Sequence, residues 1–231
     1  MALALEGTPV HNNATSGSSL TTGAFTTSQA AEVFIAVGSN FASANSVSSI
    51  SGGGLTWSRR TTGGNAVQPI ELWAAQAGSA LSGVQFTLTY SAAVQFTTVD
   101  VFAVSGQDTS TIWDADASIP VNSSTDPISV STSNANDFIT GSFRCSTASP
   151  TEGTGYTKIS GADFQLAEYK IVSATQSGLS ITMGTGAGTA NGAVADAVMA
   201  AAGGGGGGGG VSLLPERYYR TQCGMTGWIE Q

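Results

Sequence analysis

The side chains that could carry out acid–base catalysis are few in this sequence and lie far apart along it. The single histidine, His11, stands among asparagines and threonines, and a Ser-His-Asp or Cys-His arrangement would need it in a formed pocket. We therefore expect His11 to be an exposed loop residue. Paired carboxylates for glycoside hydrolysis must face one cleft, and nothing in the positions of Glu71, Asp100 and Asp114 places them together. The sequence also lacks a Gly-x-Ser-x-Gly elbow and a Walker loop. It predicts no catalytic residue and no enzyme.

Two aspartates two residues apart, Asp114 and Asp116, form the candidate metal site. On a strand their side chains would point to the same face, and a loop could also bring them together around Ca²⁺ with backbone carbonyls. The spacing lacks the full liganding loop of a calcium motif, and aspartate is an ordinary loop residue. The sequence therefore predicts no metal and no cofactor, with this pair as the calcium candidate.

Three tryptophans flank predicted turns and are candidates for glycan binding: Trp57, Trp73 and Trp113. Exposed indole rings can stack on sugars, but a tryptophan in the core or over a sheet edge has the same appearance in a sequence. Both interpretations stay open. Four phenylalanines on the apolar faces of predicted strands are expected in the core: Phe34, Phe86, Phe102 and Phe143.

The chain changes character at a run of eight glycines, residues 203–210. Residues 1–202 are rich in Ser, Thr, Ala and Gly, whereas residues 211–231 combine large apolar side chains with arginines. A segment this short cannot bury such side chains against itself. It must lie on the body, on a second copy or on another protein.

We therefore divide the chain into a body (1–202), a polyglycine segment (203–210) and an extended C-terminal arm (211–231) for assembly or partner binding. An arm folded back onto its own body is the alternative. Tyrosine, tryptophan and arginine dominate binding hot spots. The arm residues expected to bind a partner are Leu213, Leu214, Arg217, Tyr218, Tyr219, Arg220 and Trp228.

Apolar and polar residues alternate along most of the body, which is the period of half-buried strands. The alternation is unbroken in 84–90, while 32–37 and 99–104 are apolar on both faces, as central strands would be. The alanine-rich segment 193–202 could form a helix, but Val194 and Val198 fit a strand that closes the sheet, and we prefer the strand.

Further strands are predicted from the same patterns at 55–60, 70–75, 128–131, 138–145, 156–159, 164–172 and 179–183. Glycine-rich turns are predicted at 51–54 and 62–65. About a dozen short strands joined by such turns are typical of an all-β sandwich.

Composition limits the partners and the compartment. The net charge is −8 with no basic patch, which argues against nucleic acid as a partner. No segment approaches ~18 uninterrupted apolar residues, so no membrane span is predicted. The opening residues lack the features of a signal peptide, and we expect synthesis in a host cytoplasm. In that setting Cys145 is expected to be a small buried hydrophobe rather than a disulfide partner of Cys223.

Four segments in the first half of the body carry a resemblance to a known group of proteins: GLTWSRR (54–60), IELWAA (70–75), VQFTLTYS (84–91) and VDVFAVSG (99–106). With a G-x-x-W strand start and a V-x-V-x-x-V-S-G strand end, their order resembles the jelly-roll or Ig-like sandwich modules of phage virion proteins and bacterial surface proteins. The resemblance implies an antiparallel, jelly-roll-like β-sandwich over about residues 5–200. In phages such modules decorate capsids or build fibres, and in bacteria they serve as adhesive repeats.

Together these features predict a non-enzymatic structural protein of the virion, a phage capsid decoration or fibre subunit. It would assemble through its terminal arms with itself, as a homo-oligomer for which a trimer is one candidate, and with other virion proteins. The alternative is a glycan- or receptor-binding adhesin module of a phage tail or bacterial surface, which would use Trp57, Trp73 or Trp113.

Overall fold

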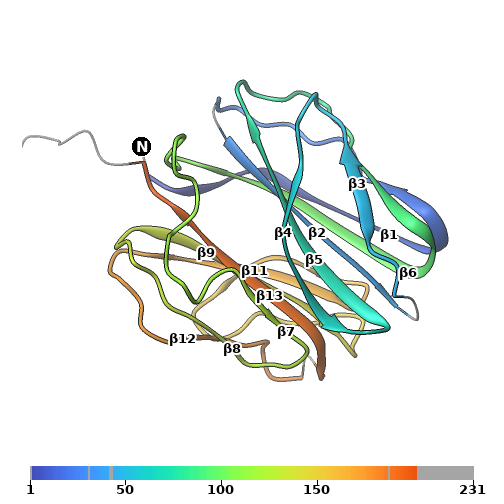
Figure 1. The fold of residues 1–231 in the computed structure, drawn as a ribbon. Helices are drawn as coiled ribbons and strands as arrows, with labels where there is room; N and C mark the ends of the chain where they lie inside the picture. The colour runs from blue at the N-terminus through green and yellow to red at the C-terminus, as the bar shows by residue number, and fades with distance from the viewer. Residues whose placement is uncertain (1, 31, 42–43, 187, 202–231) are drawn as a thin grey trace, which may run out of the picture.

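The computed structural model describes residues 2–30, 32–41, 44–186 and 188–201 (Figure 1). Every pairing between the strands of these residues is antiparallel, and no helix occurs among them. The prediction of an all-β antiparallel fold is therefore confirmed. The polyglycine segment and the C-terminal arm, with all the arm residues expected to bind a partner, lie outside the described residues.

The first half of the body forms a six-stranded sheet with the order β1-β6-β2-β5-β4, in which β3 pairs with β6 off this path. Its strands are β1 (Ala4–Thr21), β2 (Glu32–Phe41), β3 (Val47–Ser51), β4 (Ser58–Asn65), β5 (Gln68–Ala77) and β6 (Thr87–Ser105). The segments predicted at 84–90 and 99–104 are not separate strands, because β6 runs without a break from one to the other.

The second half forms a five-stranded sheet with the order β10-β11-β9-β13-β7 and a small two-stranded sheet, β12-β8. Its strands are β7 (Val121–Ser123), β8 (Ile128–Val130), β9 (Asp137–Cys145), β10 (Thr157–Ala162), β11 (Gln165–Val172), β12 (Leu179–Ile181) and β13 (Ala190–Met199). The strand interpretation of the alanine-rich segment is confirmed, since β13 pairs with β9 along its length.

The two large sheets pack against each other (Figure 1). Val37, Leu72 and Phe102 of the first sheet share a buried cluster with Phe138 and Val198 of the second. The apolar character of both faces in the central strands follows from this layering, because each sheet also buries its outer face. The result is a β-sandwich-like body with a cluster between the sheets and one beyond each.

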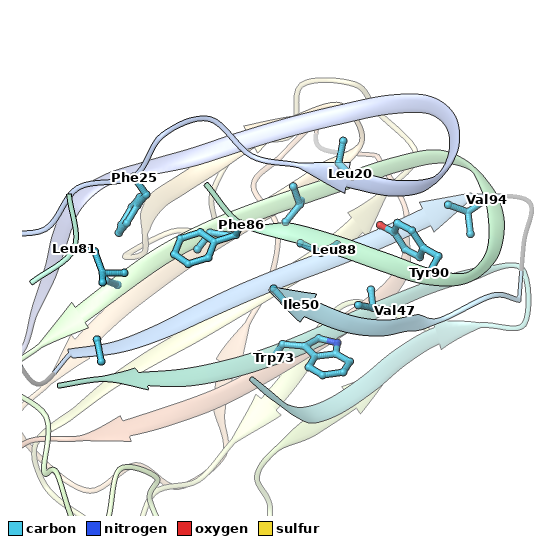
Figure 2. Close-up of a cluster of buried hydrophobic side chains, with 14 residues drawn as sticks. Leu20, Phe25, Val47, Ile50, Trp73, Leu81, Phe86, Leu88, Tyr90 and Val94 are labelled. Atoms are coloured by element: carbon cyan, nitrogen blue, oxygen red, sulfur yellow. The ribbon is translucent and has the colours of Figure 1, made fainter. Parts of the chain in front are cut away.

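The outer face of the first sheet is covered by other parts of the same half of the chain (Figure 2). Leu88 and Tyr90, in the first part of β6, share a buried cluster with Trp73 of β5. Gly38 of β2 makes room for this cover, because a Cβ there would lie only 2.9 Å from Cδ2 of Leu88 and 3.2 Å from Cγ2 of Val47. The strand thus needs glycine for close approach rather than for a turn.

The prediction of a turn at 62–65 is wrong, because a glycine there also serves close approach rather than a turn. Thr62 to Asn65 belong to β4, and the chain reverses at the next two residues, between Asn65 and its partner Gln68. A Cβ on Gly63 would lie 2.2 Å from the carbonyl oxygen of Ala193 in the opposite sheet. This glycine lets the two sheets approach, and sequence alone does not separate that use from a turn.

The predicted core phenylalanines Phe86, Phe102 and Phe143 are fully buried, as expected, whereas the side chain of Phe34 lies outside what the structure describes. Cys145 is buried as well, and burial raises the pKa of its thiol to about 12; Cys223 lies outside the described residues. Within the described part of the chain, no helix is long and apolar enough to cross a membrane.

Candidate ligand-binding cleft

An open cleft with aromatic walls lies at one end of the body, where the last residue of β2 meets the start of β13. Its volume is about 500 Å³, within the usual range of ligand sites, about 300–1,000 Å³. The residues that line this Phe–Arg cleft are Phe41, Gln68, Phe96, Arg144, Cys145, Ser146, Phe164 and Asn191. Three of them are large apolar side chains with much of their surface in solvent: Phe41 (40% exposed), Phe96 (49%) and Phe164 (39%).

The turn between β10 and β11 presents Phe164 to the cleft. Ala162 pairs with Gln165, so Asp163 and Phe164 form a two-residue loop, with φ angles of 49° and 66°. Positive φ at both loop residues is the type I′ pattern, which favours Asn-Gly. Holding an aspartate and a phenylalanine there costs about 1–2 kcal/mol per residue. The fold accepts this strain and displays an exposed ring.

Phe41 and Phe96 form the other aromatic wall. Their rings meet edge to face with centroids 6.0 Å apart. Phe96 also has positive φ, 47°, and it lies in the irregular part of β6, beside the register shift between β2 and β6 that falls between Ser39 and Phe41. Local irregularity therefore turns all three rings away from the core, where alternation alone would not have predicted an aromatic patch.

Arg144 forms the polar floor of the cleft. Its side chain leaves the end of β9 and is only 3% exposed, and its Nη1 donates to the carbonyl oxygens of Asp163 (3.1 Å) and Phe164 (3.4 Å). The guanidinium carbon lies 6.0 Å from the ring centroid of Phe41 and 5.6 Å from that of Phe164. These contacts fix the guanidinium between two aromatic rings, an arrangement that favours the cation.

Hydrogen-bonding capacity is left over in this cleft. Nε of Arg144 and Oε1 of Gln68 are buried and have no hydrogen-bond partner among the described residues. A buried donor or acceptor without a partner costs about 1–3 kcal/mol. The cleft is therefore lined by two polar side chains that keep unused hydrogen-bonding capacity beside the aromatic walls.

Arg144 differs from the buried carboxylates that also keep an open oxygen, such as Asp137 and Glu168. Burial raises the pKa of Asp137 to about 6 and that of Glu168 to about 7, so these groups can respond to burial by taking up a proton. Burial lowers the pKa of Arg144, but a guanidinium does not lose its proton in proteins. Arg144 therefore stays charged in the wall of the cleft.

A polar cluster beside the cleft ties the β10–β11 turn to the first sheet. Nδ1 of His11 lies 2.7 Å from Oδ1 of Asp100, and its Nε2 lies 2.8 Å from Oδ2 of Asp163. The hydrogen bond with buried Asp100 is the main reason that the pKa of His11 is raised to about 9, with Asp163 adding to it against the effect of burial. His11 is thus a cation at neutral pH, held between carboxylates.

The expectation that His11 is an exposed loop residue is wrong. It lies in β1 and pairs with Asp100 of β6, because the polar segment around it forms an edge strand that the sequence patterns did not indicate. Ser160 approaches the same ring nitrogen as Asp100, with its Oγ 3.3 Å from Nδ1. A Ser-His-Asp triad needs the serine and the aspartate on different nitrogens, so this cluster has the geometry of an ionic link.

The three tryptophans named as glycan candidates do not come together at the cleft. Trp73 is buried in the core, where its Nε1 donates to Glu71. Trp57 is half-buried and packs edge-on against Phe86, with centroids 5.5 Å apart. Trp113 lies under the guanidinium of Arg60, 4.2 Å from its ring centroid. These positions fit the core and edge-covering interpretation, and sugar stacking on them stays a prediction.

The calcium candidates Asp114 and Asp116 lie in the loop after β6, away from the cleft. Oδ1 of Asp114 accepts hydrogen bonds from the backbone N–H groups of Asp116 and Ser133 and from the Ser133 hydroxyl, and Oδ2 accepts one from Asn134 N–H. Asp116 accepts a bond from Ser118 N–H. In the described part of the chain, no group of three or more His, Cys, Asp or Glu side chains could hold a metal ion.

Sequence reasoning missed the cleft because its residues come from six separate segments. A signal was present: Phe41, Phe96 and Phe164 each follow a polar residue outside an alternating pattern, and Arg144 is a charge within an otherwise uncharged stretch of strand. The predicted strand 164–172 begins one residue too early, because Phe164 lies in the turn before β11.

Comparisons with protein-family models, curated proteins and solved structures found no match to this chain.

Proposed function

We propose that the protein is a non-enzymatic structural subunit of a virus particle, a phage capsid decoration or fibre protein that assembles through its C-terminal arm. The proposal rests on the division between a layered β body and an arm rich in tyrosine, tryptophan and arginine beyond a glycine run. We also propose that the body is a jelly-roll-like module similar to those of phage virion proteins. Its layered antiparallel sheets are compatible with such a module.

One observation carries the proposal: the Phe–Arg cleft leaves Nε of Arg144 and Oε1 of Gln68 without partners between exposed phenylalanine rings. Exposed apolar side chains around a few polar groups are typical of a binding site. The titratable groups beside it support a binding role, because His11 is engaged by carboxylates at both ring nitrogens and so serves as an ionic link rather than as an available base.

Sedimentation velocity on the full chain, beside a chain that ends at Ala202, tests this function. We expect the full chain to form a defined oligomer or larger assembly, and the shortened chain to be a monomer with the same β-type circular dichroism. Two identical monomers would contradict assembly through the arm.

A glycan- or receptor-binding adhesin module is the second candidate. The exposed ring of Phe96 in the cleft favours it, since aromatic faces stack on sugars and Arg144 would suit an acidic sugar. Titration with N-acetylneuraminic acid tests this candidate. Saturable binding that is lost in Phe96→Ala would support it, and heat signals identical for the two proteins would contradict it.

A further inference from the structure

We propose that the Phe–Arg cleft of one copy is the docking site for the C-terminal arm of a second copy, with Trp228 between the phenylalanine rings and Glu230 at Arg144. This inference rests on the proposed arm-dependent assembly and names the receptor for the arm.

The chemistry of the arm matches what the cleft leaves unsatisfied. Trp228 and Glu230 stand two residues apart, and side chains at this spacing project to the same side of an extended chain. An indole ring suits the aromatic walls, and its N–H is a donor for the side chain of Gln68. The carboxylate of Glu230 is an acceptor of opposite charge for the guanidinium of Arg144, and a charge-assisted bond is about twice as strong as a neutral one.

The cleft is already built in the described body, which lowers the cost of binding. Arg144 is fixed by its bonds to the Asp163 and Phe164 carbonyls, and the turn that carries Phe164 is held through Asp163 by His11 and by Asn13, whose Nδ2 donates to the same carboxylate at 2.6 Å. Preorganised side chains lose little conformational freedom when a ligand arrives. An aromatic anchor that enters such a pocket has the properties of a hot spot.

The arm leaves the body at the end opposite to the cleft. Asn191, in the cleft, lies at the start of β13, whereas Ala201 follows the end of that strand and bonds to Gly106, beside the N-terminal segment (Figure 1). A ten-residue strand spans about 30 Å. An arm that filled its own cleft would have to run back over that distance.

In a head-to-tail stack, the cleft of the second copy lies beside the point where the arm of the first copy leaves its body. The arm then reaches a cleft without running back along its own body. The stretch from Ala201 to Trp228 could extend up to about 90 Å, so length does not prevent the contact. Head-to-tail contacts of this kind are heterologous and generate rings or filaments, which are the assemblies expected of a decoration or fibre subunit.

Photocrosslinking on the full chain tests the inference. A ¹⁴N protein that carries Trp228→p-benzoylphenylalanine is mixed with a ¹⁵N protein that has the natural residue, irradiated and digested. We expect ¹⁴N–¹⁵N crosslinks to peptides that contain Phe41, Phe96 or Phe164. They should fall about tenfold or more, as for a hot-spot residue, when the ¹⁵N partner carries Phe164→Gly or Arg144→Gln.

A matched control is Arg59→Gln in the ¹⁵N partner. Arg59 is also an arginine over an aromatic ring, that of Trp73 at 5.7 Å, but it does not line the cleft, and its loss should leave the crosslinks unchanged. The Phe164→Gly variant is expected to fold, because glycine adopts the positive φ at this position without strain.

The outcomes separate this inference from the proposed function. Crosslinks of the ¹⁴N–¹⁵N type to peptides away from the cleft would overturn the docking site and leave arm-dependent assembly standing. Crosslinks only within one molecule, or none, would overturn both. Crosslinks to the cleft that persist in Phe164→Gly and Arg144→Gln would also contradict the stated contacts.

Discussion

Arg144 and Asp114 are both charged and almost fully buried, yet their surroundings differ. The four hydrogen bonds to the Asp114 carboxylate come from Asp116, Ser133 and Asn134 within the chain. Burial by itself raises the pKa of Asp114, but these bonds outweigh it and hold the pKa below its usual range. Arg144 has bonds from Nη1 only to neighbouring carbonyls, and its Nε has no partner among the described residues.

The two groups lie near opposite ends of β9. Asn134, which donates to Asp114, also donates to Asp137 at the start of the strand, while Arg144 stands near its end. A carboxylate saturated by local N–H groups stabilises a loop, whereas a cation that keeps its proton and an unused donor beside exposed aromatic rings marks a candidate binding site.

The largest expected effect separates these two roles. Asp114→Ala should lower the free energy of unfolding by about 3 kcal/mol, because the N–H groups of Asp116, Ser133 and Asn134 lose their acceptor. Urea denaturation of the variant and the wild type measures it. The folded fraction of the Asp114→Ala protein should still form crosslinks between its cleft and the arm of a second copy. A loss of these crosslinks without a loss of stability would contradict the roles given to Asp114 and Arg144.

The second effect concerns pH at the cleft end. The pKa of His11 is raised to about 9 in the folded protein from an ordinary value near 6.5, so its contribution is fully present below about pH 6.5 and is lost as pH rises through about 9. We expect the wild type to lose about 2 kcal/mol more than His11→Gln between pH 6 and pH 10. Urea denaturation of both proteins at both pH values checks this. Equal losses would show that the ionic link to Asp100 and Asp163 contributes nothing.

The smallest effect on stability is expected for Phe164→Gly. The ring is exposed and glycine suits the positive φ of the turn, so the free energy of unfolding should stay within about 1 kcal/mol of the wild type or rise. Thermal unfolding measures this change. A marked loss of stability would mean that the ring serves the fold and is not displayed for a ligand.

The sequence predicted the strands well where one face is buried. The alternation of Leu88 and Tyr90 with threonines reappears as buried and exposed positions in β6, and β13 is a strand although alanine favours helix. Glycine was ambiguous, since Gly63 serves close approach between sheets rather than a turn. β1 was missed because its outward-facing polar residues leave no apolar alternation to detect.

The site could not be predicted, for a different physical reason. Phe96 and Phe164 face the cleft because of local backbone irregularities with positive φ. Arg144 becomes part of the cleft only through its contacts with the β10–β11 turn. The orientation of these side chains depends on tertiary packing and not on the local spacing of residues in the sequence. The sequence did single out the arm that the cleft is proposed to bind.

Sedimentation velocity on two full-length variants tests whether the Phe–Arg cleft is the assembly surface. Phe164→Gly removes a ring that lines the cleft, and Arg59→Gln changes an arginine that lies over Trp73, outside the cleft. We predict that Arg59→Gln assembles as the wild type does and that Phe164→Gly sediments as a folded monomer. Assembly of Phe164→Gly to the same extent as the wild type would contradict the account.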